Sequence, residues 1–87
     1  GRLFGKLGYE PHGERIRSDR GIQRWGEFYH NFSHLPSAVI PQKGVVEERI
    51  EVYNIEGTVT YVLQLDYQVF PYGTTFIIQR VPGSAIP

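Results

Sequence analysis

The hydrophobic and polar positions alternate most regularly in the second half of the chain, where they predict three β-strands. Thr58–Phe70 places apolar side chains at every second position, with polar ones between them. Val45–Ile55 shows a shorter version of the same alternation, and Thr74–Val81 is a third extended segment with apolar residues on both faces. A period of two residues is typical of a strand with one buried and one solvated face. Turn residues at Glu56-Gly57 and Pro71-Tyr72-Gly73 separate the segments, so we expect an antiparallel meander.

The last of these predicted strands carries apolar side chains on both faces. Phe76 and Ile78 fall on one face, whereas Ile77 falls on the other. Strands that are apolar on both faces are normally covered on both sides. We therefore expect this strand to be covered by the N-terminal half of the chain or by another protein chain.

Residues 20–35 fit two kinds of element. Apolar side chains recur there at helical spacing, and Ser18 or Asp19 could cap the start of a helix. Gly26 in the middle weakens the helix by ~1 kcal/mol, and the aromatic side chains favour a strand as much as a helix. Pro36 ends either element, because a proline disfavours helical angles in the residue before it. The spacing favours a helix by a small margin, with a strand as the alternative.

These elements predict a mainly β fold for a single small domain of 87 residues. We expect a small antiparallel sandwich or meander sheet covered by residues 22–41. The alternative is an α+β fold with one helix at about 20–35 packed on a three-stranded antiparallel sheet. Residues 1–21 lack a sustained period and are predicted to be mostly loop or arm, and residues 82–87 form a tail. The chain begins at Gly1 and contains no Met, so we expect a processed chain or a piece of a longer polypeptide.

The composition excludes several classes of protein. Nine Lys and Arg against nine Asp and Glu give a net charge of zero, which argues against a highly charged nucleic-acid binder. The absence of Cys excludes disulfides, zinc–thiolate sites and thiol chemistry. No apolar run approaches the ~20 residues that cross a bilayer, so we expect no transmembrane segment.

Four arginines form the main candidate for binding a phosphate or a nucleic acid: Arg15, Arg17, Arg20 and Arg24, followed at once by Trp25. Arginine beside aromatic side chains can hold phosphates and stack bases. The same residue types are enriched in protein interfaces. Interleaved acidic residues dilute the charge, so a solvated face with local ion pairs is the first interpretation, a protein interface the second and nucleic acid the third.

Metal binding and catalysis have less support. Glu27, His30 and His34 would share one face of a helix, and their side chains are of types that bind metals. Three ligands at this spacing still need a fourth group, and no paired motif of a known metal site accompanies them. We therefore expect surface or interface histidines, no metal or other cofactor, and no enzymatic activity, since a nucleophile elbow and a glycine-rich phosphate loop are also lacking.

The interface candidates are aromatic and aliphatic residues from residues 25–32 and from the last predicted strand. They are Trp25, Phe28, Tyr29, Phe32, Phe76, Ile77 and Ile78. These residues predict a non-catalytic structural or interaction module of a larger multi-chain assembly, with other protein chains as partners in a homo- or hetero-oligomer. The alternative is a phosphate- or nucleic-acid-binding domain that uses the arginine cluster.

Residues 28–81 carry a familiar succession of elements. FYHNFSHLPSAVIPQKGVVEERIEV contains an Asn-bearing strand and a Val-x-Pro-x-x-Gly corner, and EGTVTYVLQLDYQVFPYGTTFIIQRV contains two alternating strands. In the generic sense this succession resembles an immunoglobulin-like β-sandwich. The resemblance implies a sandwich rather than a helix on an open meander, and it implies no particular function or site.

Overall fold

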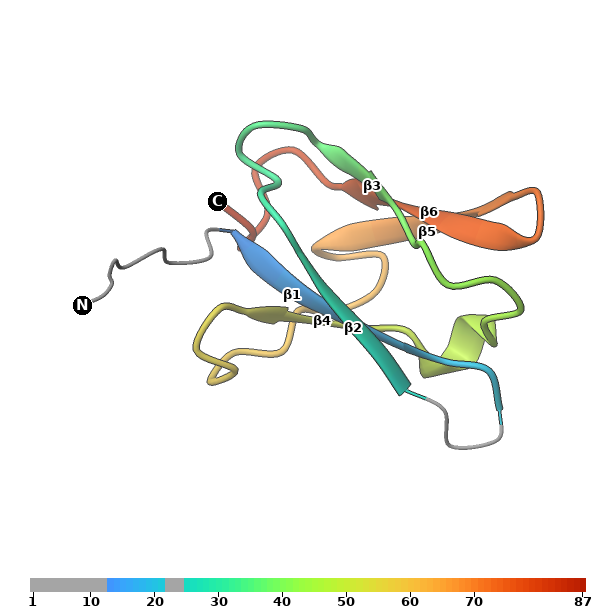
Figure 1. Ribbon diagram of the computed structural model, residues 1–87. Helices are drawn as coiled ribbons and strands as arrows, with labels where there is room; N and C mark the ends of the chain where they lie inside the picture. Colours follow the sequence, from blue (N-terminus) through green and yellow to red (C-terminus); the bar gives the residue numbers. More distant parts are fainter. Residues whose placement is uncertain (1–12, 22–24) are drawn as a thin grey trace.

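The computed structural model describes residues 13–21 and 25–87 and shows a mainly β protein (Figure 1). The mainly β fold that the alternation predicts is therefore confirmed. A short 3₁₀ helix, η1 (Glu47–Arg49), is the helical element of the described residues. The described strands are β1 (Glu14–Asp19), β2 (Trp25–His30), β3 (Ser37–Val39), β4 (Glu51–Asn54), β5 (Tyr67–Tyr72) and β6 (Thr75–Arg80).

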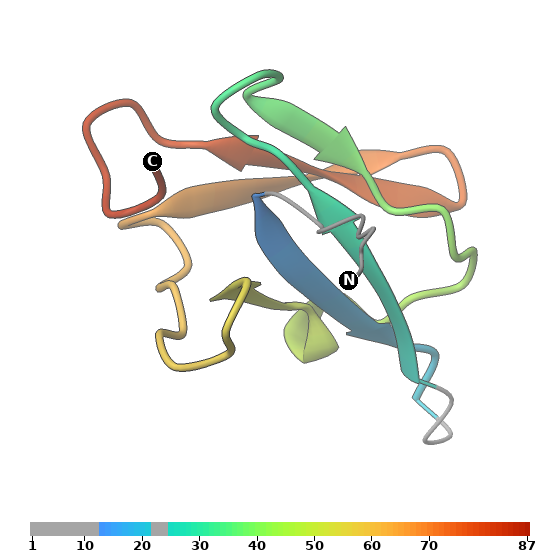
Figure 2. The ribbon, with the colours of Figure 1, turned by 60° about the vertical axis from the view of Figure 1, so that its left-hand side comes forward.

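The strands form two three-stranded antiparallel sheets. The first sheet has the order β2-β1-β4, and the second has the order β3-β6-β5. In the first sheet Ile16 of β1 lies opposite Phe28 and Val52. In the second sheet Ile78 of β6 lies opposite Ala38 and Val69. Figures 1 and 2 show β1 and β2 of the first sheet running at an angle to β5 and β6 of the second.

The hydrophobic core draws on both sheets. Ile16 and Val52 of the first sheet and Ile78 of the second are fully buried in one cluster. Segments between and after the strands contribute as much as the strands do: Phe32, Ile40, Val45, Ile50, Tyr61 and Ile86. Burial of this apolar surface stabilises the fold by about 25 cal/mol for each Å² removed from water.

Residues 25–30 form strand β2, so the predicted helix is wrong over this part of residues 20–35. Residues 22–24 lie outside the described residues. Along β2 the side chains alternate between exposed and half-buried, and β1 pairs with the whole strand from Trp25 to His30. This pairing partner outweighs the helical spacing, and a helix would also carry Gly26 in its interior at a cost of ~1 kcal/mol.

The predicted meander is wrong in its strand order, because β4 pairs with β1 and not with β5. The predicted strand Thr58–Phe70 is also wrong in its first part. Residues 58–66 form a loop with isolated bridges at Thr60 and Leu63, and β5 begins only at Tyr67. In the same way η1 interrupts the strand predicted from Val45. The last predicted strand corresponds closely to β6.

The remaining segments differ from the simple picture of a sheet with a cover. Residues 14–19, predicted to be loop, form β1, the central strand of the first sheet. Residues 22–41 give one strand, β2, to the first sheet and another, β3, to the second, which agrees with the strand alternative for this cover. Residues 82–87 contain no strand or helix, yet Ile86 is fully buried in the core.

Candidate functional site

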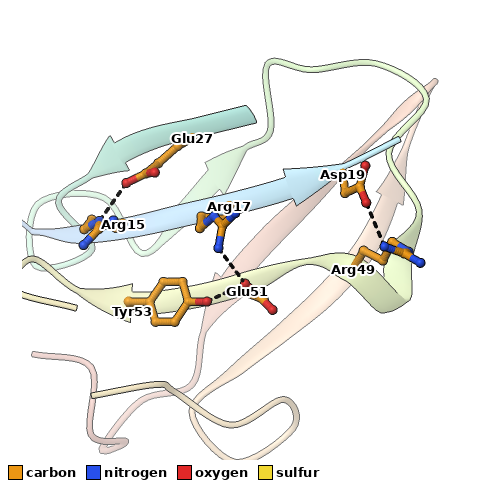
Figure 3. A network of polar contacts seen from close by, with 7 residues as sticks. All are labelled: Arg15, Arg17, Asp19, Glu27, Arg49, Glu51 and Tyr53. Atoms are coloured by element: carbon orange, nitrogen blue, oxygen red, sulfur yellow. Dashed lines mark hydrogen bonds and ion pairs between the residues drawn. The ribbon is translucent and has the colours of Figure 1, made fainter. Parts of the chain in front are cut away.

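The outer face of the first sheet collects the charged and aromatic side chains of three strands. Ile16, Phe28 and Val52 point toward the core, so their neighbours along each strand point away from it. We call this outer surface the polar face, and Figure 3 shows most of it. Its members are Arg15 and Arg17 of β1, Trp25, Glu27 and Tyr29 of β2, and Glu51 and Tyr53 of β4.

Arg15 is held from both neighbouring strands. Its Nε donates a hydrogen bond to Glu27 Oε2 over 2.7 Å. Its guanidinium carbon lies 6.0 Å from the centre of the Tyr53 ring, which faces Arg15 across β1 and β4. The hydrogen bond to Glu27 raises the pKa of Arg15 further, so this side chain is a permanent cation.

Arg17 leans over Trp25 and toward Glu51. Its guanidinium carbon is 4.4 Å from the centre of the Trp25 ring, a cation–π distance. Its closest carboxylate contact runs from Nη1 to Glu51 Oε1 over 3.6 Å. The hydroxyl of Tyr53 donates a hydrogen bond to the same carboxylate, which raises the pKa of Tyr53 (Figure 3). Each arginine of the polar face therefore has an acidic partner, Glu27 for Arg15 and Glu51 for Arg17.

An open hollow of about 230 Å³ lies between these side chains. Of the residues that the structure describes, Arg15, Arg17, Tyr53 and Gly57 line it, so this part of the chain gives it two cationic walls and no acidic one. Gly57 closes the turn after β4, where its N–H donates to Asn54 O over 3.0 Å. Its φ of 75° favours glycine, and a Cβ there would lie 2.7 Å from Arg15 Nη1. The turn thus leaves room for the guanidinium at the edge of the hollow.

The structure brings together only part of the predicted arginine cluster. Arg15 and Arg17 share the polar face with Trp25, as the sequence suggested for an aromatic and basic surface. Arg20 is exposed and donates instead to the backbone oxygen of Lys43 over 3.0 Å. Arg24 lies outside the described residues. Tyr53 and Gly57 were missed, because only the pairing of β4 with β1 places them beside the arginines.

The histidine candidates do not converge. Glu27 points to the polar face, whereas His30 is on the core side of the same strand, and its Nε2 is 2.8 Å from Leu35 O. His34 is exposed in the turn that follows. Among the residues that the structure describes, no group of three or more His, Asp and Glu side chains could hold a metal ion. The helical spacing that suggested a metal site therefore does not exist in this part of the chain.

The outer face of the second sheet is different in kind, because it carries no charged side chain in the described strands. We call it the uncharged face. Val39, Ile77 and Phe70 lie side by side across all three strands, and Tyr72 extends the row. Val39 is 44% exposed, Phe70 46% and Tyr72 57%. The other members are Ser37, Gln68, Thr75 and Gln79.

The predicted interface residues are divided between these two faces and the core. Trp25 and Tyr29 are exposed on the polar face, and Ile77 lies half-buried on the uncharged face. The remaining four candidates face inward: Phe32 and Ile78 in the core, and Phe28 and Phe76 packed against it. Three of the seven candidates therefore face outward, and Val39, Phe70 and Tyr72 are exposed in addition to them.

Three acidic residues are buried, although nothing in the sequence distinguishes them from surface acids. Asp19 is fully buried, and Arg49 Nη1 donates to its Oδ2 over 2.9 Å (Figure 3). Glu14 accepts a hydrogen bond from the N–H of Phe32 over 3.2 Å, and burial raises the pKa of its carboxyl. Asp66 is 6% exposed and binds the backbone of two segments. These acids hold the fold together.

No family model, curated protein or solved structure matches this chain. The geometry defines a small β domain with one polar and one uncharged outer face, and the resemblance to an immunoglobulin-like sandwich stays a prediction. In the described part of the chain, no helix has the length and apolar character needed to cross a membrane.

Proposed function

We propose that this chain is a non-catalytic interaction module of a multi-chain assembly, and that it contacts a second copy of itself through the uncharged face. The observation that carries the proposal is the exposed apolar row Val39–Ile77–Phe70, which crosses all three strands of the second sheet. The inner side of the same sheet already supplies Ala38 and Ile78 to the core. The outer row is therefore not needed to complete the core.

The absence of charge on this face supports a protein contact. Charged residues make up 21% of the chain, yet none of the eight outward side chains of the second sheet is charged. The centres of protein interfaces are depleted in charge and enriched in aromatic residues. Phe70 and Tyr72 would be the aromatic anchors of such a contact.

A second copy is the partner that fits this face most simply. In a twofold contact the two copies use the same surface patch, so the patch has to be compatible with itself. A twofold contact through the polar face would place arginines near arginines and glutamates near glutamates, unless its alignment kept the like charges apart. The uncharged face carries no such penalty, because it has no like charges to oppose.

Size-exclusion chromatography with light scattering over a concentration series tests the proposal. We expect the full chain to self-associate and Phe70→Ser to return it to a monomer with an unchanged circular dichroism spectrum. Leu65→Ser is the matched control, because Leu65 is 67% exposed but lies in the loop before β5. We expect this variant to associate like the parent chain.

Two results would contradict the proposal. One is a parent chain that stays monomeric at every concentration. The other is an oligomer that survives Phe70→Ser combined with Val39→Ser, since the contact would then lie elsewhere.

A further inference from the structure

We infer that the hollow on the polar face binds a carboxylate group. This site goes beyond the proposed function, because it lies on the first sheet and does not involve the uncharged face. Its walls are Arg15, Arg17, Tyr53 and Gly57.

Both arginines have N–H donors that can bind a further acceptor. A guanidinium has five N–H donors. The hydrogen bond from Arg15 to Glu27 uses its Nε, and its Nη1 lies on the side of Gly57. The contact from Arg17 to Glu51 is 3.6 Å long, which exceeds a hydrogen bond. Arg17 also lies within hydrogen-bond reach of the Tyr53 hydroxyl. Arg15 can therefore take a further oxygen acceptor while it keeps its bond to Glu27, and Arg17 can exchange its long contact with Glu51 for a closer one.

The spacing of the two arginines suits a small planar anion. They are two positions apart on β1, so their side chains leave the sheet on the same side with Cα atoms about 7 Å apart. An acceptor placed between them is within reach of both guanidinium forks, which match the geometry of a carboxylate. The hollow of about 230 Å³ has space for such a group and the carbon that bears it.

The local charge favours a single negative charge over a double one. Glu27 and Glu51 offset the two arginines, so the polar face is formally neutral before a ligand arrives. A phosphate dianion would leave this surface with two negative charges, whereas a carboxylate leaves one. The ring of Tyr53 beside Arg15 gives the carbon part of an organic acid an apolar wall.

Nuclear magnetic resonance on the full chain tests this inference. The backbone amides and the arginine Nε–H groups would be followed during titration with acetate, N-acetylglycine and the α-amide of N-acetylaspartate. Inorganic phosphate and chloride at matched ionic strength are the reference anions. We expect saturable shifts at Arg15, Arg17 and Gly57 with the carboxylates. N-acetylglycine presents a chain-terminal carboxylate and the aspartate derivative a side-chain one, so the tighter of the two names the source.

Variants then assign the binding to the two arginines. We expect Arg15→Gln and Arg17→Gln each to weaken the binding at least about tenfold, since each removes one charged fork. Arg20→Gln is the matched control, because Arg20 is exposed and bonded to Lys43 O away from the hollow. The shifts in the parent chain locate the site even if one of the glutamine variants does not fold.

Shifts that do not saturate, tighter binding of phosphate than of any carboxylate, or equal weakening by Arg20→Gln would each overturn the inference. The titration is repeated on Phe70→Ser, in which we expect unchanged affinity. The experiments therefore distinguish a failure of the proposed self-association from a failure of the proposed carboxylate binding.

Discussion

At the scale of single residues, Asp66 joins the loop before β5 to the residues after β6. Its Oδ2 accepts a hydrogen bond from Val62 N over 2.8 Å, and its Oδ1 accepts one from Ala85 N over 3.2 Å. Its backbone oxygen accepts from Val81 N and from Ser84 Oγ. One buried carboxylate thus fixes both the loop before β5 and the residues after β6, and it brings Ile86 to the core.

We predict that Asp66→Ala lowers the free energy of unfolding by about 2–3 kcal/mol, because two part-buried hydrogen bonds lose the charged acceptor that joins their segments. Asp66→Asn keeps one amide oxygen and should cost less. Urea denaturation measures both values, and hydrogen exchange at Val62 and Ala85 shows whether the two segments are released. Glu56→Ala in an exposed turn is the control. A loss no larger than that of the control would show that Asp66 is not the link.

Glu14 makes the stability depend on pH. It is 4% exposed, and burial raises the pKa of its carboxyl above the value in the unfolded chain. The fold therefore favours the protonated form of Glu14 more than the unfolded chain does. The stabilisation that this gives is complete below the unfolded pKa and is lost as the pH rises through the folded pKa.

Glu14→Gln should consequently raise the free energy of unfolding at pH 7, and the gain should disappear at a pH below about 4, the unfolded value. The neutral amide can still accept the hydrogen bond from Phe32 N through its oxygen. Denaturation curves at both pH values test this against Glu48→Gln, an exposed substitution on η1. A gain that is the same at both pH values would contradict the role of the buried charge.

At the scale of the elements, two neighbouring residues of β6, Ile77 and Ile78, lie on opposite faces of the second sheet. Ile78 is fully buried, and Ile77 is half-buried on the uncharged face. We predict that Ile78→Ala costs about 3–4 kcal/mol of unfolding free energy, because it leaves a cavity in the core. Ile77→Ala should cost less than about 1 kcal/mol in the monomer. Equal costs in urea denaturation at low protein concentration would mean that the two faces are wrongly assigned.

β6 is also the element that the sequence predicts best. Its short run of apolar residues follows a clear turn, and the strand pairs with β5 just before it. Local information is sufficient here, because the turn at Gly73 and the β-favouring residues after it together specify the hairpin.

Residues 58–66 show where local information fails. Their apolar and polar residues alternate more regularly than those of β6, yet they form a loop in which Leu63 and Leu65 are exposed. The contacts of Asp66 with the residues after β6 decide the path of the chain, and no local pattern records them. The same holds for residues 25–30, where the pairing with β1 decides between strand and helix.

The candidate site divides in the same way. The sequence draws attention to Arg15, Arg17 and Trp25 because they are close along the chain. Tyr53 and Gly57 join them only through the register of β4 against β1, which sets Tyr53 opposite Arg15. The register depends on the pairing of the whole sheet, so the hollow cannot be predicted from the local sequence.

At the scale of the whole molecule, the two sheets share one core and cannot complete it separately. Ile16 of the first sheet and Ile78 of the second belong to the same buried cluster, together with Phe32 and Ile40 from the connections on either side of β3. A small domain of this kind normally unfolds in a single cooperative transition. Loss of either sheet would expose the apolar surface of the other.

We therefore predict that Ile16→Ala destabilises β6 as much as it destabilises β1, although Ile16 lies in the other sheet. Native-state hydrogen exchange would show this as an equal fall, of about 3–4 kcal/mol, in the opening free energies of the most protected amides of both strands. Val39→Ala, on the exposed face of the second sheet, should leave both sets within about 1 kcal/mol of the parent chain. If the amides of β6 kept their protection in Ile16→Ala while those of β1 lost it, the sheets would be separate folding units. The uncharged face would then persist on a second sheet that holds together without the first.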